Sequence, residues 1–122
     1  MFTNRIVRHG GPGFVQNDQG QVVSGHKFAK DFAREADPNV KHWDFRSCYS
    51  SDGGPFSNGQ MLANRTGAAV TAYSGKVNGI GGDEKVFHPQ SERVAKITGT
   101  VNEIWGSTAG FAVGCFGKGR RS

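Results

Sequence analysis

Hydrophobic and polar positions in the N-terminal part of the chain change from a strand-like to a helix-like pattern. Residues 4–9 have an apolar centre and are followed by Gly-Gly-Pro-Gly, which predicts a short strand with an abrupt end. In 13–23, two apolar pairs flank the turn-forming sequence Asn-Asp-Gln-Gly, as is typical of a small hairpin. Ser24 is a good N-cap, and apolar residues then recur at helical spacing to residue 36, where Asp-Pro ends the predicted helix.

The next segments repeat this order of elements. Residues 40–47 predict a second strand, and Pro55 suits the first turn of a second helix that ends at Gly67. Residues 68–75 predict a third strand. Strand, helix, strand, helix, strand is the order of a parallel sheet with right-handed crossovers, so the chain is expected to be an α/β domain.

Beyond residue 75 the pattern changes. Residues 75–89 and 93–105 are separated by turn-forming residues and predict antiparallel strands added to the parallel sheet. The chain has 122 residues, no internal repeat and no clear linker. We therefore expect one domain over 1–122, with an antiparallel C-terminal extension.

The charge of the chain narrows its possible partners only slightly. A net charge of +5 and a pI of about 9.6 favour acidic partners, including nucleic acid. The positive residues are scattered, apart from the last six residues, GKGRRS, which we expect to be a solvated, disordered tail. The sequence has no apolar run of about eighteen residues and no signal-peptide pattern at its start, so we expect no membrane span and export by another system.

Two reactive side chains stand at predicted strand ends. His9 ends the first strand and Cys48 the second, and neighbouring parallel strands lie about 4.8 Å apart, so the two side chains could meet at one edge of the sheet. An imidazole can take the proton of a thiol and make the sulfur a nucleophile. Backbone N–H groups around Gly10 and Gly11 could stabilise an oxyanion, and Asp52 is either a turn residue or part of a substrate pocket.

Other interpretations of these residues stay open at this point. Cys48 could be a small buried hydrophobic residue, or it could pair with Cys115 in an oxidising compartment. His26, His42 and His88 are expected to be surface or loop histidines. The sequence has no Cys-x-x-Cys or His-Glu-x-x-His motif, so we expect neither a metal site nor a cofactor.

Three segments together resemble a known family. The quoted sequences RHGGPGF, FRSCYSSDGGPF and MLANRTGAAVTAYSGKV, within residues 5 to about 77, are similar to clan CD cysteine peptidases, which include caspases, clostripain and gingipains. The resemblance is strongest to the small caspase-like domains of bacterial polymorphic and secreted toxins. It implies a three-layer sandwich with a mostly parallel sheet, with His9 as general acid/base, Cys48 as nucleophile and the Gly10 N–H near the oxyanion.

One feature departs from that family. The strand that leads to Cys48 carries His42, Asp44 and Arg46, whereas a buried parallel strand is usually apolar throughout. The departure indicates that this strand either lies at an edge of the sheet or has one face exposed to water.

The functional expectation is a cysteine-dependent hydrolase, most simply a protease, that acts as a secreted toxin or effector. It would be delivered into the cytoplasm of a target cell, cleave a protein substrate there and be neutralised by a cognate immunity protein. One alternative is an RNA-cleaving nuclease in which His9 acts with nearby cations, for which Arg5, Arg8 and Arg46 are candidates. A second alternative is a non-catalytic interaction module whose glycine-rich loops contact other proteins.

Overall fold

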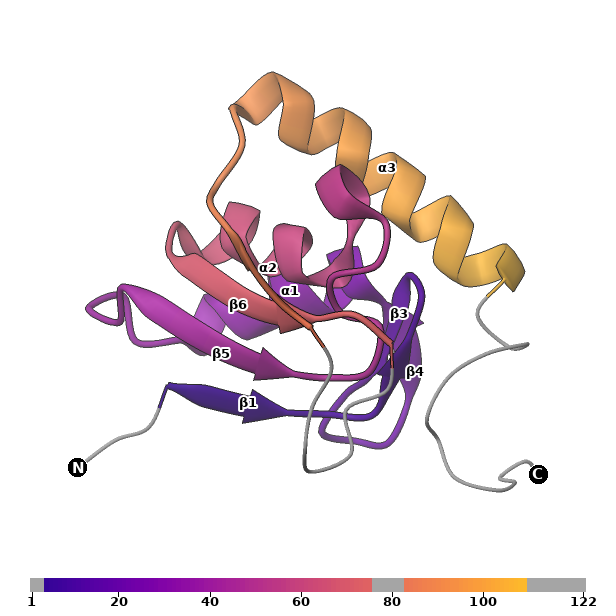
Figure 1. Cartoon of the computed structure of the whole chain (residues 1–122), viewed down its shortest axis with the longest axis horizontal. Coiled ribbons are helices and arrows are strands. Elements are labelled where there is room, and N and C mark those ends of the chain that lie inside the picture. The colour runs from indigo at the N-terminus through magenta and orange to yellow at the C-terminus, as the bar shows by residue number, and fades with distance from the viewer. Residues whose placement is uncertain (1–3, 76–82, 110–122) are drawn as a thin grey trace.

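The fold is a small mixed α/β domain, seen in a computed structural model that describes residues 4–75 and 83–109 (Figure 1). A four-stranded sheet has the order β1-β5-β6-β7, and a three-stranded sheet has the order β2-β3-β4. The elements are β1 (Arg5–Val7), β2 (Gly10–Gly11), β3 (Phe14–Gln16), β4 (Val22–Ser24), α1 (Gly25–Glu35), β5 (His42–Arg46), the short 3-10 turn η1 (Gly54–Phe56), α2 (Asn58–Thr66), β6 (Ala69–Tyr73), β7 (Glu84–Phe87) and α3 (Glu92–Ala109).

The predicted parallel strands are confirmed. β1 pairs with β5, and β5 pairs with β6, each in the parallel sense. The predicted hairpin over 13–23 is β3 with β4, and β2 adds a third antiparallel strand to it. β7 pairs antiparallel to β6, so the expected strand over 75–89 is present in its second half, while 76–82 lie outside the described residues.

The helices form where capping residues and apolar spacing allow. Ser24 Oγ accepts a hydrogen bond from the Lys27 N–H at 3.0 Å, which caps α1 as expected. Ser57 does the same for α2, which therefore begins three residues after Pro55, while Pro55 itself lies in η1. α2 ends at Gly67, whose φ of 76° gives the left-handed C-cap that glycine adopts most easily.

The prediction of an antiparallel strand over 93–105 is wrong, because this segment belongs to α3. Its several β-branched residues favour a strand when propensity is considered alone. Tertiary packing decides otherwise, since the helix places Gly99 directly against the His26 ring on α1. A Cβ atom at position 99 would lie 2.9 Å from that ring, so a side chain there would hold α3 away.

The main core lies between the four-stranded sheet and the helices α1 and α2. Its fully buried members include Phe45, Leu62 and Val70, which come from β5, α2 and β6. α2 approaches β6 closely because Gly59 has no side chain: a Cβ there would lie 2.6 Å from the Ala72 Cβ. This face of the sheet is therefore dry and tightly packed.

The opposite face of the four-stranded sheet is polar, so a three-layer sandwich is not confirmed. Along β5, Trp43 and Phe45 are buried on the core side, while Asp44 and Arg46 alternate with them and project to the other side. β5 lies between β1 and β6, so it is a central strand with one wet face, not an edge strand. This one-sided burial explains why β5, a parallel strand, carries the polar residues His42, Asp44 and Arg46.

Replacing Gly59 tests the close contact between α2 and β6. Helix propensity alone would make Gly59→Ala stabilising by about 1 kcal/mol. The overlap with Ala72 should reverse the sign and lower the free energy of unfolding by about 1–3 kcal/mol, measured by urea denaturation. Lys30→Ala on the exposed side of α1 is the control and should change stability by less than about 0.5 kcal/mol. A Gly59→Ala protein more stable than wild type would contradict this packing.

Candidate functional site

The predicted pair His9 and Cys48 lies at one edge of the four-stranded sheet. Val7 of β1 lies opposite Arg46 of β5 in the parallel register. His9 follows Val7 by two positions, and Cys48 follows Arg46 by two positions. Gly10 connects the two loops, because a Cβ there would overlap Ser47 Oγ and lie 3.5 Å from the Cys48 carbonyl oxygen. The parallel register therefore brings the two predicted strand ends together.

The two side chains differ in their access to solvent. His9 is exposed, and its carbonyl oxygen accepts a hydrogen bond from the Gln16 N–H, which ties its loop to β3. Cys48 is only 2% exposed and its sulfur is in a disulfide. The other cysteine of the chain, Cys115, lies outside the described residues. In this state Cys48 carries no thiol, and it packs as a buried residue.

The loop after Cys48 is a hydrogen-bonded turn. Ser50 is fully buried, and its hydroxyl accepts a hydrogen bond from the Tyr73 N–H at 2.9 Å. Asp52 accepts a long hydrogen bond from the Gly75 N–H, 3.4 Å, which matches the turn interpretation of this residue. The Ser50 carbonyl oxygen accepts a hydrogen bond from the Gly59 N–H of α2 at 2.7 Å. These contacts fix the loop against β6 and α2.

A pair of buried amides connects three parts of the fold. Asn58 donates from Nδ2 to the carbonyl oxygens of Gly11 and Phe14, at 3.0 and 3.1 Å. Its Oδ1 accepts from Asn102 Nδ2 at 3.0 Å, so α2 is joined to α3. Asn102 Oδ1 in turn accepts from the His26 N–H at the start of α1. Both amides are at most 1% exposed, and each bond satisfies a polar group that burial would otherwise leave unpaired.

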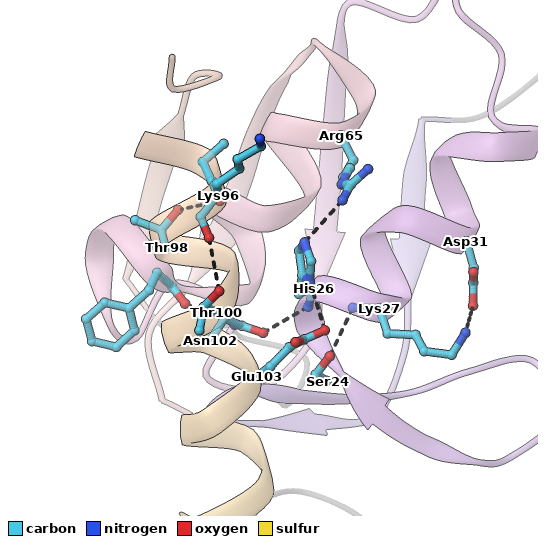
Figure 2. A network of polar contacts seen from close by, with 12 residues as sticks. Ser24, His26, Lys27, Asp31, Arg65, Lys96, Thr98, Thr100, Asn102 and Glu103 are labelled. Carbon is cyan, nitrogen blue, oxygen red and sulfur yellow. Dashed lines mark hydrogen bonds and ion pairs between the residues drawn. The ribbon is translucent and has the colours of Figure 1, made fainter. Parts of the chain in front are cut away.

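His26 is held at both ring nitrogens between three helices (Figure 2). Nδ1 lies 2.9 Å from Glu103 Oε2 on α3, and Nε2 lies 3.2 Å from Arg65 Nη2 on α2. Because a guanidinium only donates, Nε2 accepts and Nδ1 carries the proton that it donates to Glu103. With both nitrogens engaged, His26 joins α1 to α2 and α3. Sequence analysis missed this role because its partners are far away in the chain.

The wet face of the sheet carries a second polar cluster, around Asp44. This carboxylate accepts hydrogen bonds from Tyr73 Oη at 2.6 Å and from Arg46 Nε at 3.1 Å, and Arg5 Nε lies 3.6 Å away. Burial, followed by the hydrogen bond to Asp44, raises the pKa of Tyr73 to about 12. Burial alone would raise the pKa of Asp44, but the hydrogen bonds from Tyr73 and Arg46 and the nearby guanidinium groups keep it below its usual value.

α3 has an unusual distribution of polar and apolar residues. Its inward face includes the buried residues Thr98 and Asn102. Large aliphatic side chains lie instead on the outer face, at spacings of three, four and three residues, and we call them the α3 stripe: Val94, Ile97, Val101 and Ile104, which are 41%, 60%, 37% and 60% exposed. A helix that packs only on its own domain shows the opposite arrangement.

Two further features of the described part of the chain concern metal binding and membrane crossing. Within residues 4–75 and 83–109, no three His, Cys, Asp or Glu side chains gather as a metal site would require. None of the helices described there has the length and apolar character needed to cross a membrane.

Comparison with known proteins gives the family. The family model described as "Secreted effector protein SteB" matches residues 3–116. Secreted effector protein SteB of Salmonella typhimurium, strain 14028s, is 33% identical over 105 residues, which cover 81% of this chain and 79% of that protein. The protein of the same name from strain LT2 matches with the same identity and coverage. No solved structure matches the chain.

These findings correct the proposed resemblance to clan CD peptidases. The three sequence segments that suggested it, RHGGPGF, FRSCYSSDGGPF and MLANRTGAAVTAYSGKV, fall within the span matched by the SteB model. Short glycine-rich motifs after strands recur in many α/β domains, which explains why they misled the assignment. The identification of a caspase-like peptidase is therefore wrong.

The Asp44 cluster predicts a specific pH dependence of stability. Tyr73→Phe removes one donor to Asp44 and should lower the free energy of unfolding at neutral pH by about 1 kcal/mol. The native pKa of Tyr73, about 12, exceeds the usual value of about 10, so its contribution is present below pH about 10 and is lost as pH rises toward 12. The urea midpoint of the wild type should thus fall more steeply than that of Tyr73→Phe over this interval.

Tyr49→Phe is the matched control for this measurement. It removes the hydroxyl of the only other tyrosine in the chain and leaves the bond between Tyr73 and Asp44 in place. It should keep the steep decline of the wild type at alkaline pH. Equal slopes for the wild type and Tyr73→Phe would show that this cluster does not couple Tyr73 to folding.

Proposed function

We propose that this chain, which belongs to the SteB family of secreted effector proteins, acts in its target cell by binding an α-helix of another protein along the α3 stripe. Membership of the family confirms the expected effector role and secreted localisation. The binding role is our proposal, and the single observation that carries it is the exposed aliphatic row on α3.

The spacing of the α3 stripe supports a helical partner. Intervals of three, four and three residues are those of the a and d positions in a coiled-coil seam, where side chains of one helix insert between those of another. Isolated exposed aliphatic residues are common on protein surfaces, but a continuous row on one helix is typical of an interaction site. An amphipathic helix of a partner would bury this row in register.

The charges beside the α3 stripe and the rigidity of α3 both bear on the kind of partner helix that can bind there. Arg93 and Lys96 are exposed on the same helix, whereas Glu103 is bound to His26. Beside the N-terminal half of the row, these two positive charges stand against one exposed carboxylate, Glu92, so the net charge there is positive and favours a partner helix with carboxylates next to its apolar seam. Asn102 and His26 hold the inner face of α3, so the helix is already ordered before it binds, which lowers the entropic cost of association.

A thiol-dependent hydrolase is the second candidate, favoured by the register of β1 and β5. This register brings the ends of the His9 and Cys48 strands to one edge of the sheet. The chemistry requires reduction of the Cys48 disulfide, and in a cytosol the thiols of the glutathione and thioredoxin systems would have to supply the two electrons. His9 would then accept the thiol proton as the Cys48 sulfur attacks an amide carbonyl carbon, and the C–N bond would break as the leaving amine takes that proton from His9. Water would then hydrolyse the thioester, releasing the carboxylic acid and returning the thiol.

The nuclease alternative receives less support. Phosphate cleavage would need cations available around His9. Arg5 and Arg46 lie beside Asp44, and Arg8 is paired with Asp18 at 2.6 Å. The three arginines expected to serve there are therefore bound to carboxylates.

Photo-crosslinking tests the helical partner. A benzoylphenylalanine residue placed at position 97 should crosslink a protein of the target cell, and peptide mapping should locate the bond on a helix with a 3-4-3 apolar pattern. The same group at Lys30, on exposed α1, should give no such product. Val101→Asp should reduce the crosslink from position 97 at least about tenfold, because a carboxylate in an apolar seam is strongly disfavoured.

The outcomes against this proposal are distinct. Val101 is the least exposed member of the stripe, so Val101→Asp must be shown to keep the circular dichroism and unfolding midpoint of the wild type before its crosslink is compared. Equal products from positions 97 and 30 would show nonspecific contact. A product that joins position 97 to a second copy of this chain would replace the partner helix by self-association. Either result overturns the proposed binding role.

Alkylation tests the thiol candidate separately. After reduction with dithiothreitol, iodoacetamide should modify Cys48 faster than Cys115, and His9→Ala should slow only the reaction at Cys48. Cys48→Ala should also abolish the effect of the protein on target cells while the fold is retained. Equal rates at both cysteines, or a folded Cys48→Ala protein with full effect, would exclude this candidate.

A further inference from the structure

A cavity of about 330 Å³ lies between one side of α1 and the turn that joins β3 to β4. This volume is at the lower end of the range for small-molecule sites, and it suits a single long side chain better than a whole metabolite. α3 contributes no residue to it, so the cavity is separate from the α3 stripe. Its lining residues are Phe28, Asp31, Phe32 and Glu35 of α1, Ala36 directly after that helix, and Arg8, Asn17, Asp18 and Gln19.

The apolar part of the cavity is made of two fixed aromatic rings. Phe28 and Phe32 are stacked with ring centroids 6.0 Å apart and planes inclined by 21°. Phe32 also packs edge-on against Trp43 of β5, with centroids 5.0 Å apart. Phe28 is buried and Phe32 is half-buried, so part of this surface remains open to a ligand. A flat, ordered aromatic surface is the kind on which a planar cation stacks.

The charges of the cavity favour a cation. It is lined by the carboxylates Asp18, Asp31 and Glu35 and by one cation, Arg8. Arg8 is held in place, because it pairs with Asp18, donates to the Val7 carbonyl oxygen at 2.8 Å and lies over the Phe28 ring. Lys27 and Arg34 of α1 pair with Asp31 at 2.9 and 3.6 Å, so Glu35 is the lining carboxylate whose charge is not balanced by such a pair.

The two carboxylates on α1 are not equally engaged. Asp31 accepts a hydrogen bond from Lys27 Nζ at 2.9 Å, which is the main cause of the lowered pKa of this carboxyl, so Asp31 is ionised at neutral pH. Glu35 lies one turn further along α1 and is exposed. Within the described residues no hydrogen bond or ion pair is found for it. Glu35 is thus the carboxylate available to an incoming cation.

We propose that this cavity binds an arginine side chain of a partner protein, with the guanidinium stacked on Phe32 and bonded to Glu35. The planar guanidinium suits both contacts at once, since it stacks on aromatic faces and bonds to a carboxylate through two parallel N–H groups. A lysine ammonium could make the ion pair but would gain less from the flat ring. The cavity would act as an anchor for one basic residue, independently of the helix bound along the α3 stripe.

The test uses a minimal probe and its neutral counterpart. N-acetyl-arginine-methylamide is titrated into the ¹⁵N-labelled protein, with N-acetyl-citrulline-methylamide as a control of the same shape without the charge. We expect the arginine probe to shift the amide signals of Phe32 and Glu35 with a dissociation constant in the millimolar range, on the order of 1–10 mM for one side chain. The citrulline probe should bind at least about threefold more weakly.

Two variants assign the binding to this cavity. Glu35→Gln removes the available carboxylate from an exposed position and should weaken the arginine probe about threefold without affecting the fold. Glu92→Gln, an exposed carboxylate on α3 outside the cavity, should leave binding unchanged. Equal binding of arginine and citrulline, tighter binding of a lysine probe, or equal effects of the two variants would overturn the proposal. So would the absence of any shift at α1.

Discussion

The contact between Asn58 and Asn102 is the interaction on which the arrangement of this domain depends. It lies where α2, α3 and the pair of strands β2 and β3 meet, and Asn58 also donates to the carbonyl oxygens of Gly11 and Phe14 on those strands. Buried amides leave little tolerance in position, because a displaced partner leaves a polar group without a bond. The network therefore fixes α3 against the domain more specifically than apolar packing alone would.

The inner polar contacts explain the outer apolar face of α3. Apolar side chains are not needed on the inward side, where Asn102 bonds to α1, α2 and η1 and Gly99 admits the His26 ring. The large aliphatic residues then lie on the side facing solvent. The same division appears in the sheet, with a dry face under α1 and α2 and a polar face around Asp44. Both features leave surfaces of defined chemistry on a small domain.

The loop that carries Cys48 follows the carboxyl end of β5, where it can belong to a reactive site or can serve only to hold the fold together. The parallel register places the loops of His9 and Cys48 together, as their strand-end positions suggested. The same loop is buried and joins the ends of β5 and β6, because Ser50 Oγ donates to the Phe45 carbonyl oxygen and accepts from the Tyr73 N–H. A polar, glycine-rich loop after a strand is compatible with a reactive site and equally with a buried loop that only stabilises the fold. Sequence alone does not distinguish these, since burial depends on contacts between distant segments.

Local patterns in the sequence determined the parallel core, the hairpin and the two capped helices, because caps such as Ser24 and Gly67 and the periods of apolar residues act within a few positions. The polar residues of β5 also indicated its single wet face. Three features depended on tertiary structure: the helical state of 93–105, the burial of Cys48 and the cavity beside α1. Each results from contacts between residues distant in sequence, such as His26 with Glu103 or Arg8 with Asp18, and no local pattern encodes such pairs.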